Sequence, residues 1–294
     1  MPAFAQSLAA LVLLVQFALF SAAGAENLAG TWSIAELRDG RIRLTLETGD
    51  STTRSHGVDS HDIDARALGL SAALAAKVPG PVSFSLARDA GSFACAGVAG
   101  NGKGRGTFSF APSDAFVAAL RERGYPPFSL EQLLHAAMAD VTIDFVDGLR
   151  AAGFGRVSYE KLIPLRALGV DRAYARSMRD VFPDIGAETL IPLRALGVSE
   201  TYVKAMRDAG LNVATSGDAI RLRALDLDLA YVRDLNAVGY GHLSTENLLQ
   251  LRALGIDAAY IRRVQAHGFA HPTIEELIRL KALDVVSIVT GDRA

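Results

Sequence analysis

Residues 56–64 carry the side chains best suited to hold a metal ion. This stretch has two histidines and three aspartates within nine residues. Because imidazole nitrogens and carboxylate oxygens are ligands of zinc and other divalent ions, it is a candidate site for a metal-dependent hydrolase. Its ligands would be His56, Asp59, His61 and Asp62. Their spacing fits no metal-binding motif whose geometry can be justified. The sequence therefore favours a solvated polar loop.

Residues 97–104 read GVAGNGKG and nearly fit the phosphate-binding pattern G-x-x-x-x-G-K-[ST]. The last position is Gly104, so the hydroxyl that would bind magnesium is missing. Strands are expected on both sides, which leaves no helix N-terminus to face a phosphate. We therefore predict a glycine-rich hairpin centred on Asn101 and Gly102, and we expect no cofactor.

A cation recurs at one position of a word that is repeated five times in the second half of the chain. The word reads LRALGV at residues 165–170, and successive copies begin 28 or 29 residues apart. Such a row could bind the carboxylates of a partner in forked pairs. Alternatively, it could pair with glutamates of the same helices (Glu160, Glu188, Glu246 and Glu275) or stay solvated at the rim. The row consists of Arg166, Arg194, Arg223, Arg252 and Lys281.

A fixed period of this length is typical of stacked repeats. The LRALGV word alternates with an aromatic-headed helical stretch such as residues 174–179, and we expect its aromatic residues to pack in the core. We predict two short helices per unit and about six units of 28–29 residues over residues 112–294. A single unit buries too little apolar surface to be stable alone, so the units must stack into a solenoid. The first helices have N-cap candidates at Ser113, Thr142, Asp171, Ser199, Asp228 and Asp257.

Three details of the repeats give further expectations. The small Ala167 is expected to let the next helix approach. Pro164 and Pro192 predict a kink or a late start in their helices, because proline lacks the N–H that an internal turn needs. Aspartate replaces glycine in three turns and is expected in a left-handed conformation there, at Asp140, Asp226 and Asp284.

Residues 26–111 have the period of two that is typical of strands. Ile42, Leu44 and Leu46 alternate with polar residues. We predict a small module of five to seven antiparallel strands. Its Gly30-Thr31-Trp32 resembles the G-x-W of lipocalin-like barrels, so a carrier of small apolar ligands is an alternative function, although the module is short for a ligand barrel. The fold class is therefore α+β multidomain: an antiparallel β module followed by an all-α two-helix-repeat solenoid. The lone Cys95 is expected in the core.

Residues 1–25 are predicted to be a signal peptide. An apolar run at residues 8–20 is followed by Ala23-x-Ala25, which favours cleavage before Glu26. The expected location is the periplasm or the medium, and no stable membrane span would remain. If cleavage fails, residues 8–20 would anchor the chain, although the run is shorter than the ~20 residues of a transmembrane helix.

The array resembles a bacterial repeat family. Its units read roughly L-hydrophobic-x-L-R-x-x-G-V-[TSD]-x-x-[YF]-[VI]-x-x-[LM]-[RK]-x-x-G-[YF], and the match covers about residues 113–285. Such repeats occur in exported proteins and as C-terminal extensions of membrane metallopeptidases of the β-lactam-sensor antirepressor type. The peptidase motif H-E-x-x-H is absent from the sequence, so the resemblance implies no peptidase activity. Leucine stands where many members carry histidine, at Leu168, Leu196, Leu225, Leu254 and Leu283.

The charge balance narrows the possible partners. With 30 basic and 32 acidic residues, the formal charge of −2 gives no bulk attraction to nucleic acid or anionic membranes. We expect a non-catalytic interaction module, a scaffold or sensor accessory, that binds a protein or peptide partner in the cell envelope. The metal-dependent hydrolase and the apolar-ligand carrier remain as alternatives.

Overall fold

The computed structural model describes residues 28–37, 40–48, 57–241 and 243–283, and only the backbone of residues 57–59. The chain forms two compact units, which divide between Asp140 and Val141. Within the described ranges, no helix has the length and apolar character needed to cross a bilayer. The predicted signal peptide at residues 1–25 and the alternative anchor at 8–20 lie outside these ranges.

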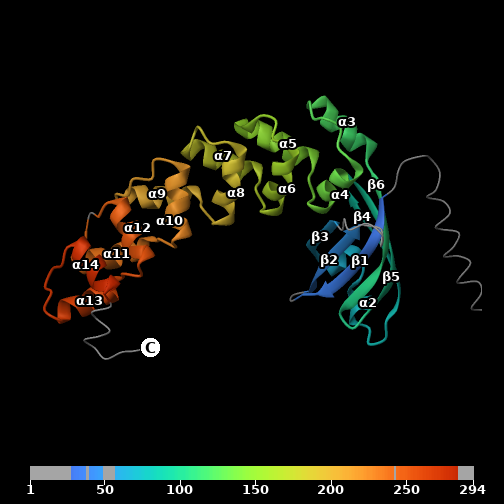
Figure 1. Ribbon diagram of the computed structural model, residues 1–294. Helices are drawn as coiled ribbons and strands as arrows, with labels where there is room; N and C mark the ends of the chain where they lie inside the picture. The colour runs from blue at the N-terminus through green and yellow to red at the C-terminus, as the bar shows by residue number, and fades with distance from the viewer. Residues whose placement is uncertain (1–27, 38–39, 49–56, 242, 284–294) are drawn as a thin grey trace, which may run out of the picture. The chain divides into compact units, whose positions relative to one another are not determined.

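The first unit is built on one antiparallel sheet (Figure 1). Six strands form it among the described residues, in the order β3-β2-β1-β6-β5-β4. The number of strands and their antiparallel pairing confirm the predicted β module. The strands are β1 (Leu28–Glu36), β2 (Arg41–Thr48), β3 (Gly57–Asp64), β4 (Gly80–Arg88), β5 (Gly91–Gly100) and β6 (Lys103–Pro112).

Strand β3 replaces the polar loop that the sequence favoured at residues 56–64. Its glycine, serine and aspartates have low strand propensity. Pairing with the strongly alternating β2 overrides this propensity, with Ile63 opposite Ile42 and His61 opposite Leu44. Charged residues are common on edge strands, where they discourage pairing with other chains. The loop interpretation was therefore wrong for residues 57–64.

The core of the first unit lies on the inner face of the sheet, around Trp32. The Trp32 ring packs edge-on against Phe84, with centroids 5.1 Å apart, and its Nε1 donates to the Ala96 carbonyl at 3.2 Å. The indole lies over glycines of the neighbouring strands: a Cβ at Gly97 would lie 2.7 Å from the ring. Buried neighbours fill the rest of this face, namely Ile34, Ile42, Leu44, Leu46, Leu86, Phe93, Cys95, Phe108 and Phe110.

Short helices cover the sheet. The segment after β3 forms η2 (Ala65–Leu68) and α2 (Ser71–Ala75). Helix α3 (Asp114–Glu122) follows β6, and α4 (Leu130–Met138) packs on β3, β5 and β6. Although the repeat pattern begins at Ser113, α3 and α4 belong to the first compact unit.

The glycine-rich segment at residues 97–104 forms the predicted hairpin. It joins β5 to β6, and its turn residues Asn101 and Gly102 have φ values of 53° and 71°. These left-handed conformations suit an Asn-Gly turn between twisted strands. Because no helix begins here, nothing in this segment resembles a phosphate loop.

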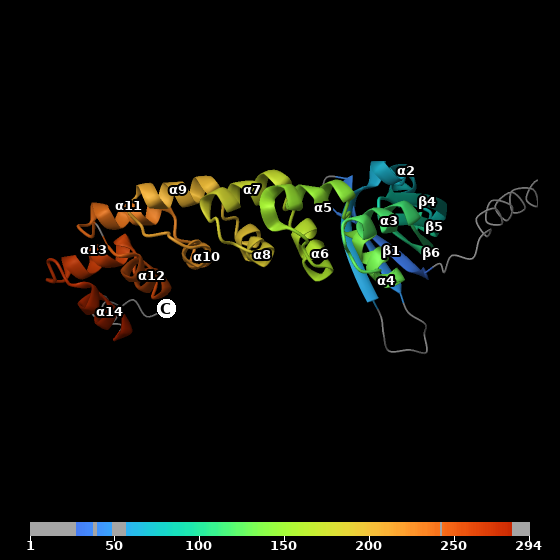
Figure 2. The same ribbon diagram turned by 90° about the horizontal axis from the view of Figure 1, so that it is seen from above.

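The second unit is a stack of helix pairs that forms two rows (Figure 2). Contacts join α5 to α7, α7 to α9 and α11 to α13 in one row, and α6 to α8, α8 to α10 and α12 to α14 in the other. The first row contains α5 (Ile143–Leu149), continued by η3 (Arg150–Phe154), then α7 (Arg172–Val181), α9 (Glu200–Asp208), α11 (Leu229–Ala237) and α13 (Ala258–Ala266). The second row contains α6 (Tyr159–Ala167), α8 (Ala187–Ala195), α10 (Ser216–Ala224), α12 (Thr245–Ala253) and α14 (Ile274–Ala282).

Capping side chains start the helices where the sequence predicted. Asp171 accepts from the Tyr174 backbone N–H at 2.7 Å, and the same geometry recurs at the other first helices. The sequence did not identify the cap of α10, where Thr215 and Asp218 form a capping box. The turns are left-handed as predicted, with φ values of 69° at Gly169 and 51° at Asp226. Asp284 lies outside the described residues.

Two details differ from expectation. Helices α6 and α8 run through Pro164 and Pro192, start at the usual place and span nine residues, as α12 does without proline. Each proline removes one hydrogen bond, to a carbonyl in an exposed first turn that water can reach. The alanine after the recurring cation is exposed in all five described words, so it does not serve close helix packing.

Candidate functional site

Each member of the recurring cation row lies over the aromatic ring of a first helix. Arg194 is 4.8 Å from the Tyr174 centroid, and Arg223 is 5.1 Å from that of Tyr202. Such cation–π contacts stabilise by about 0.5–1 kcal/mol at exposed sites. The other members repeat the arrangement: Arg166 on Phe145 at 5.6 Å, Arg252 on Tyr231 at 4.9 Å, and the Lys281 Nζ on Tyr260 at 4.8 Å.

The same arginines cap the second helix of the preceding repeat. The Arg194 Nε donates to the Leu168 carbonyl at 3.2 Å, and Leu168 is the C-cap residue of α6. The carbonyls at a helix C-terminus lack intrahelical donors, and a cation there also meets the negative end of the helix dipole. The contact recurs from Arg223 to Leu196 at 3.1 Å and from Arg252 to Leu225 at 2.9 Å.

The tyrosine beneath each arginine completes the connection. The Tyr174 hydroxyl donates to the carbonyl of Val198, the last residue of the word that carries Arg194. The equivalent bonds run from Tyr202 to Leu227 at 2.8 Å and from Tyr231 to Ile256 at 2.7 Å. Burial raises the pKa of Tyr174, Tyr202 and Tyr231 to about 12. We call these three tyrosines together with Arg194, Arg223 and Arg252 the tyrosine–arginine ladder.

The ladder changes the interpretation of the cation row. Each tyrosine–arginine pair is one rung of the ladder. A rung joins three helices, namely the two helices of one repeat and the second helix of the repeat before it. The glutamates expected as partners lie elsewhere on these helices, where Glu188 pairs with Lys161 at 2.9 Å. The carboxylate that meets Arg252 is that of Asp226, at 3.3 Å. The recurring arginine therefore has a structural role that the sequence did not reveal.

A second set of cations recurs on the first helices and was missed in the sequence. They are exposed, and each lies two residues after the aromatic residue of its helix. Lys204 pairs with Glu200 one turn earlier on α9, and the Arg233 Nε donates to a carbonyl of its own helix. These cations are separated by the same 28 or 29 residues as the repeats, and this spacing could have revealed them in the sequence. We call this set the outer cation row: Arg176, Lys204, Arg233 and Arg262.

The structure describes the side chains of only two of the four candidate metal ligands, and it separates these two. His61 and Asp62 are neighbours in β3, so their side chains point to opposite faces of the sheet. Asp62 is held by Arg43, whose Nε lies 2.9 Å from its Oδ1, and this hydrogen bond lowers the pKa of Asp62. Asp59 is described only by its backbone, opposite Leu46, and His56 lies outside the described residues. In the described part of the chain, no three His, Cys, Asp or Glu residues gather to hold a metal ion.

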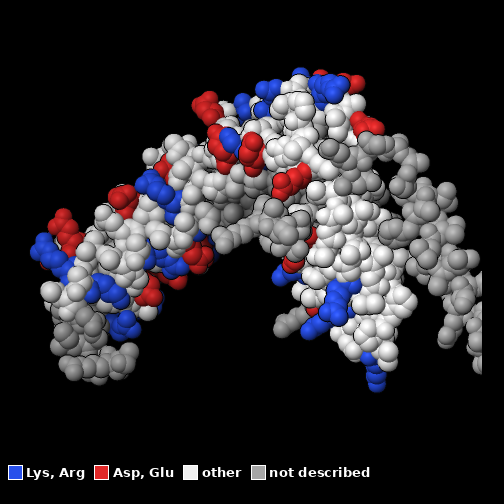
Figure 3. Space-filling model, turned by 45° about the vertical axis from the view of Figure 1, so that its right-hand side comes forward, with Lys and Arg blue, Asp and Glu red and all other residues white. Residues whose placement is uncertain are grey.

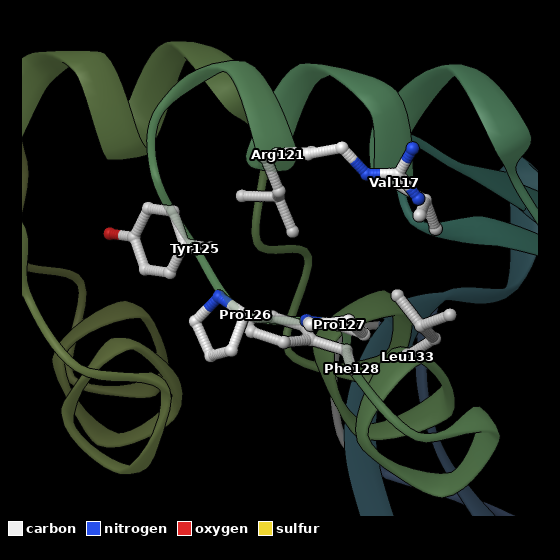
Figure 4. A pocket seen from close by; sticks show the side chains of 8 residues that line it. Val117, Arg121, Tyr125, Pro126, Pro127, Phe128 and Leu133 are labelled. Atoms are coloured by element: carbon white, nitrogen blue, oxygen red, sulfur yellow. The ribbon is translucent and has the colours of Figure 1, made fainter.

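The surface of the first unit has hollows of different size. A small one of about 40 Å³ opens between α3 and α4, where Tyr125, Pro126, Pro127 and Phe128 form the wall (Figure 4). It has room for little more than a methyl group or a water molecule. A larger hollow lies on the outer face of the sheet, over β1, β2, β5 and β6. The inner face is filled by Trp32 and its aromatic neighbours, which does not favour an apolar ligand inside the sheet.

The fold and these surfaces define an α+β protein with a β unit and a helical-repeat unit. In comparisons with known proteins, no family model, curated protein or solved structure gave a significant match to this chain.

Proposed function

We propose that this chain is a non-catalytic interaction protein of the cell envelope, and that its array binds an acidic segment of a protein or peptide along the outer cation row. The observation that carries the proposal is the recurrence of an exposed cation at one position of four first helices. The ladder arginines recur for a structural reason, but this second recurrence has no comparable role between repeats.

The spacing of the row suits an extended chain. Packed helices lie about 8–10 Å apart, and an extended peptide advances about 3.3 Å per residue. A partner with a carboxylate at about every third residue would therefore match successive cations. Small exposed residues precede each cation by one turn and leave it accessible, at Ala173, Thr201, Ala230 and Ala259.

The positive character of the row is greatest at α11 and α13. Arg233 and Arg262 have only apolar residues four positions before and after them in the sequence. In contrast, Lys204 pairs with Glu200. We therefore expect Arg233 and Arg262 to contribute most to partner binding.

A non-catalytic role fits the only thiol of the chain. Burial raises the pKa of Cys95 to about 12, so its reactive thiolate is scarce at neutral pH. Export to the envelope rests on the apolar run and the Ala23-x-Ala25 pattern. N-terminal sequencing of the mature protein is expected to begin at Glu26, and an intact N-terminus would contradict export by this route.

Proximity labelling in the native cell tests the binding proposal. The wild-type chain is compared with R176Q/K204Q/R233Q/R262Q and with a matched control, E160Q/E188Q/E246Q/E275Q, which neutralises one exposed glutamate on each of four second helices. We expect one set of neighbours for the wild type and the control, and its loss from the cation variant. Retention of all neighbours by the cation variant would contradict the proposal.

A further inference from the structure

The outer face of the first unit has an open hollow of about 500 Å³, which the side chains of Thr31, Ser33, Glu47, Arg105 and Thr107 help to line. Strand register places its side chains in two parallel rows. Thr31 on β1 lies between Glu47 on β2 and Thr107 on β6. In the next row, Arg105 on β6 lies between Ser33 on β1 and Val98 on β5. The floor includes the backbone of Gly97 and Gly106, and Trp32 packs against Gly97 from the inner face.

Two opposite charges stand at different corners of this hollow. Glu47 lies on β2, which is two strands away from β6. On β6, Arg105 lies two residues from Thr107, which is in the same row as Glu47. With strands about 4.8 Å apart and about 3.3 Å per residue, their Cα atoms are roughly 12 Å apart. The two side chains are therefore too distant to neutralise each other, and three exposed hydroxyl groups lie between them.

Both charges lack partners within the described part of the chain, where no hydrogen bond or ion pair involves either side chain. Other charges of the same outer face are paired: Arg43 and Asp62 form a forked contact at 2.9 and 3.3 Å. Much of the surface of this unit that Figure 3 shows is uncharged. A ligand that brings both an anion and a cation would thus meet no nearby competitor inside the hollow.

We propose that this hollow binds a short, extended, zwitterionic peptide, with its ammonium group at Glu47 and its carboxylate at Arg105. A guanidinium binds a carboxylate through two parallel hydrogen bonds, which fixes the direction of the ligand. The hydroxyls of Thr31, Ser33 and Thr107 pair with the peptide groups between the termini. At about 3.3–3.6 Å per residue, three or four residues span the two charges, whereas a free amino acid is too short.

Binding should be weak, because exposed ion pairs contribute little each. A dissociation constant on the order of 1 mM is expected for a peptide without favourable side chains. This site is independent of the helical array, so its failure would leave the proposed function of the array untouched.

Nuclear magnetic resonance of the ¹⁵N-labelled full chain tests the site with tetraglycine as the probe. We expect saturable shifts at the Arg105 Nε–H and at the amides of Ser33, Val98 and Thr107. Single glycine and N-acetyl-tetraglycine amide, which lacks both terminal charges, should produce at least tenfold weaker binding. Equal binding of the capped peptide, or no shifts at these residues, would overturn the proposal.

Variants separate the two charges from the general surface. E47Q and R105Q should each weaken tetraglycine binding about two- to fivefold, and the backbone spectrum of each variant reports that the fold is retained. The matched control is K103Q, an exposed cation on the same strand that lies outside the hollow. Unchanged affinity in E47Q and R105Q, or equal weakening in K103Q, would contradict the assignment.

Discussion

The two units hold their charged side chains for different reasons. In the array, Arg194, Arg223 and Arg252 stack on tyrosines and bind carbonyls of the preceding repeat, so a repeated charge is part of the scaffold. In the β unit, Glu47 and Arg105 occur once each and are brought into one hollow by strand register. A recurring charge therefore indicates partner binding only where the side chain is exposed and makes no contact between repeats, as in the outer cation row.

The largest effect is expected in the core of the β unit. Trp32→Ala removes the ring that packs on Phe84 and over Gly97. We expect a loss of about 3–5 kcal/mol in the free energy of unfolding, as for other large-to-small core substitutions. Guanidinium unfolding followed by far-ultraviolet circular dichroism measures it. Val98→Ala, an exposed change on β5, is the control and should have little effect.

A single ladder arginine should have a smaller effect. Arg223→Ala removes a ring contact and a bond to the Leu196 carbonyl, and we expect about 1–2 kcal/mol of lost stability. Arg223→Lys should retain only part of it, because the bond from Nε is lost. A double-mutant cycle with Tyr202→Leu should give a coupling of about 1 kcal/mol. Additive effects of the two substitutions would show that Arg223 and Tyr202 do not stabilise the array through their mutual contact.

The ladder tyrosines predict loss of stability in alkali. Their folded pKa of about 12 lies above the ordinary tyrosine pKa of about 10. Their contribution is therefore complete below about pH 10 and is lost as the pH rises toward 12. Denaturant midpoints measured between pH 8 and 12 should fall in this window. The Y174F/Y202F/Y231F variant should show a smaller fall, and an unchanged pH dependence would contradict the role of these hydroxyls.

The outer cation row should have the smallest effect on stability. Arg262→Gln changes an exposed side chain, so the free energy of unfolding should change by no more than about 0.5 kcal/mol. The same denaturation assay measures it. A loss as large as that of Arg223→Ala would show that this row also supports the scaffold.

The sequence predicted most of what depends on local signals. The N-caps, the left-handed turns and the period of the array follow from side chains within a few residues of each other, as Asp171 and Tyr174 illustrate. Strand β3 was missed because its pairing with β2, rather than its own composition, determines its structure. The role of Arg194 was missed because its acceptor is a backbone carbonyl, which every residue has.

The hollow of the β unit could not be predicted for a related reason. Glu47 and Arg105 are 58 residues apart, and only the pairing of β2, β1 and β6 brings them to one face. For two of the candidate metal ligands, His61 and Asp62, the opposite holds. Their closeness in sequence suggested one site, but a strand sends adjacent side chains to opposite faces.

The most direct test compares the two cation sets of the array in matched triple variants. R194Q/R223Q/R252Q removes the ladder arginines, and R176Q/R233Q/R262Q removes three cations of the outer row. The account predicts that the first variant loses about 3 kcal/mol or more of unfolding free energy, whereas the second changes by less than about 1 kcal/mol. Equal losses in the two variants would contradict the distinction between a structural row and a row available to a partner.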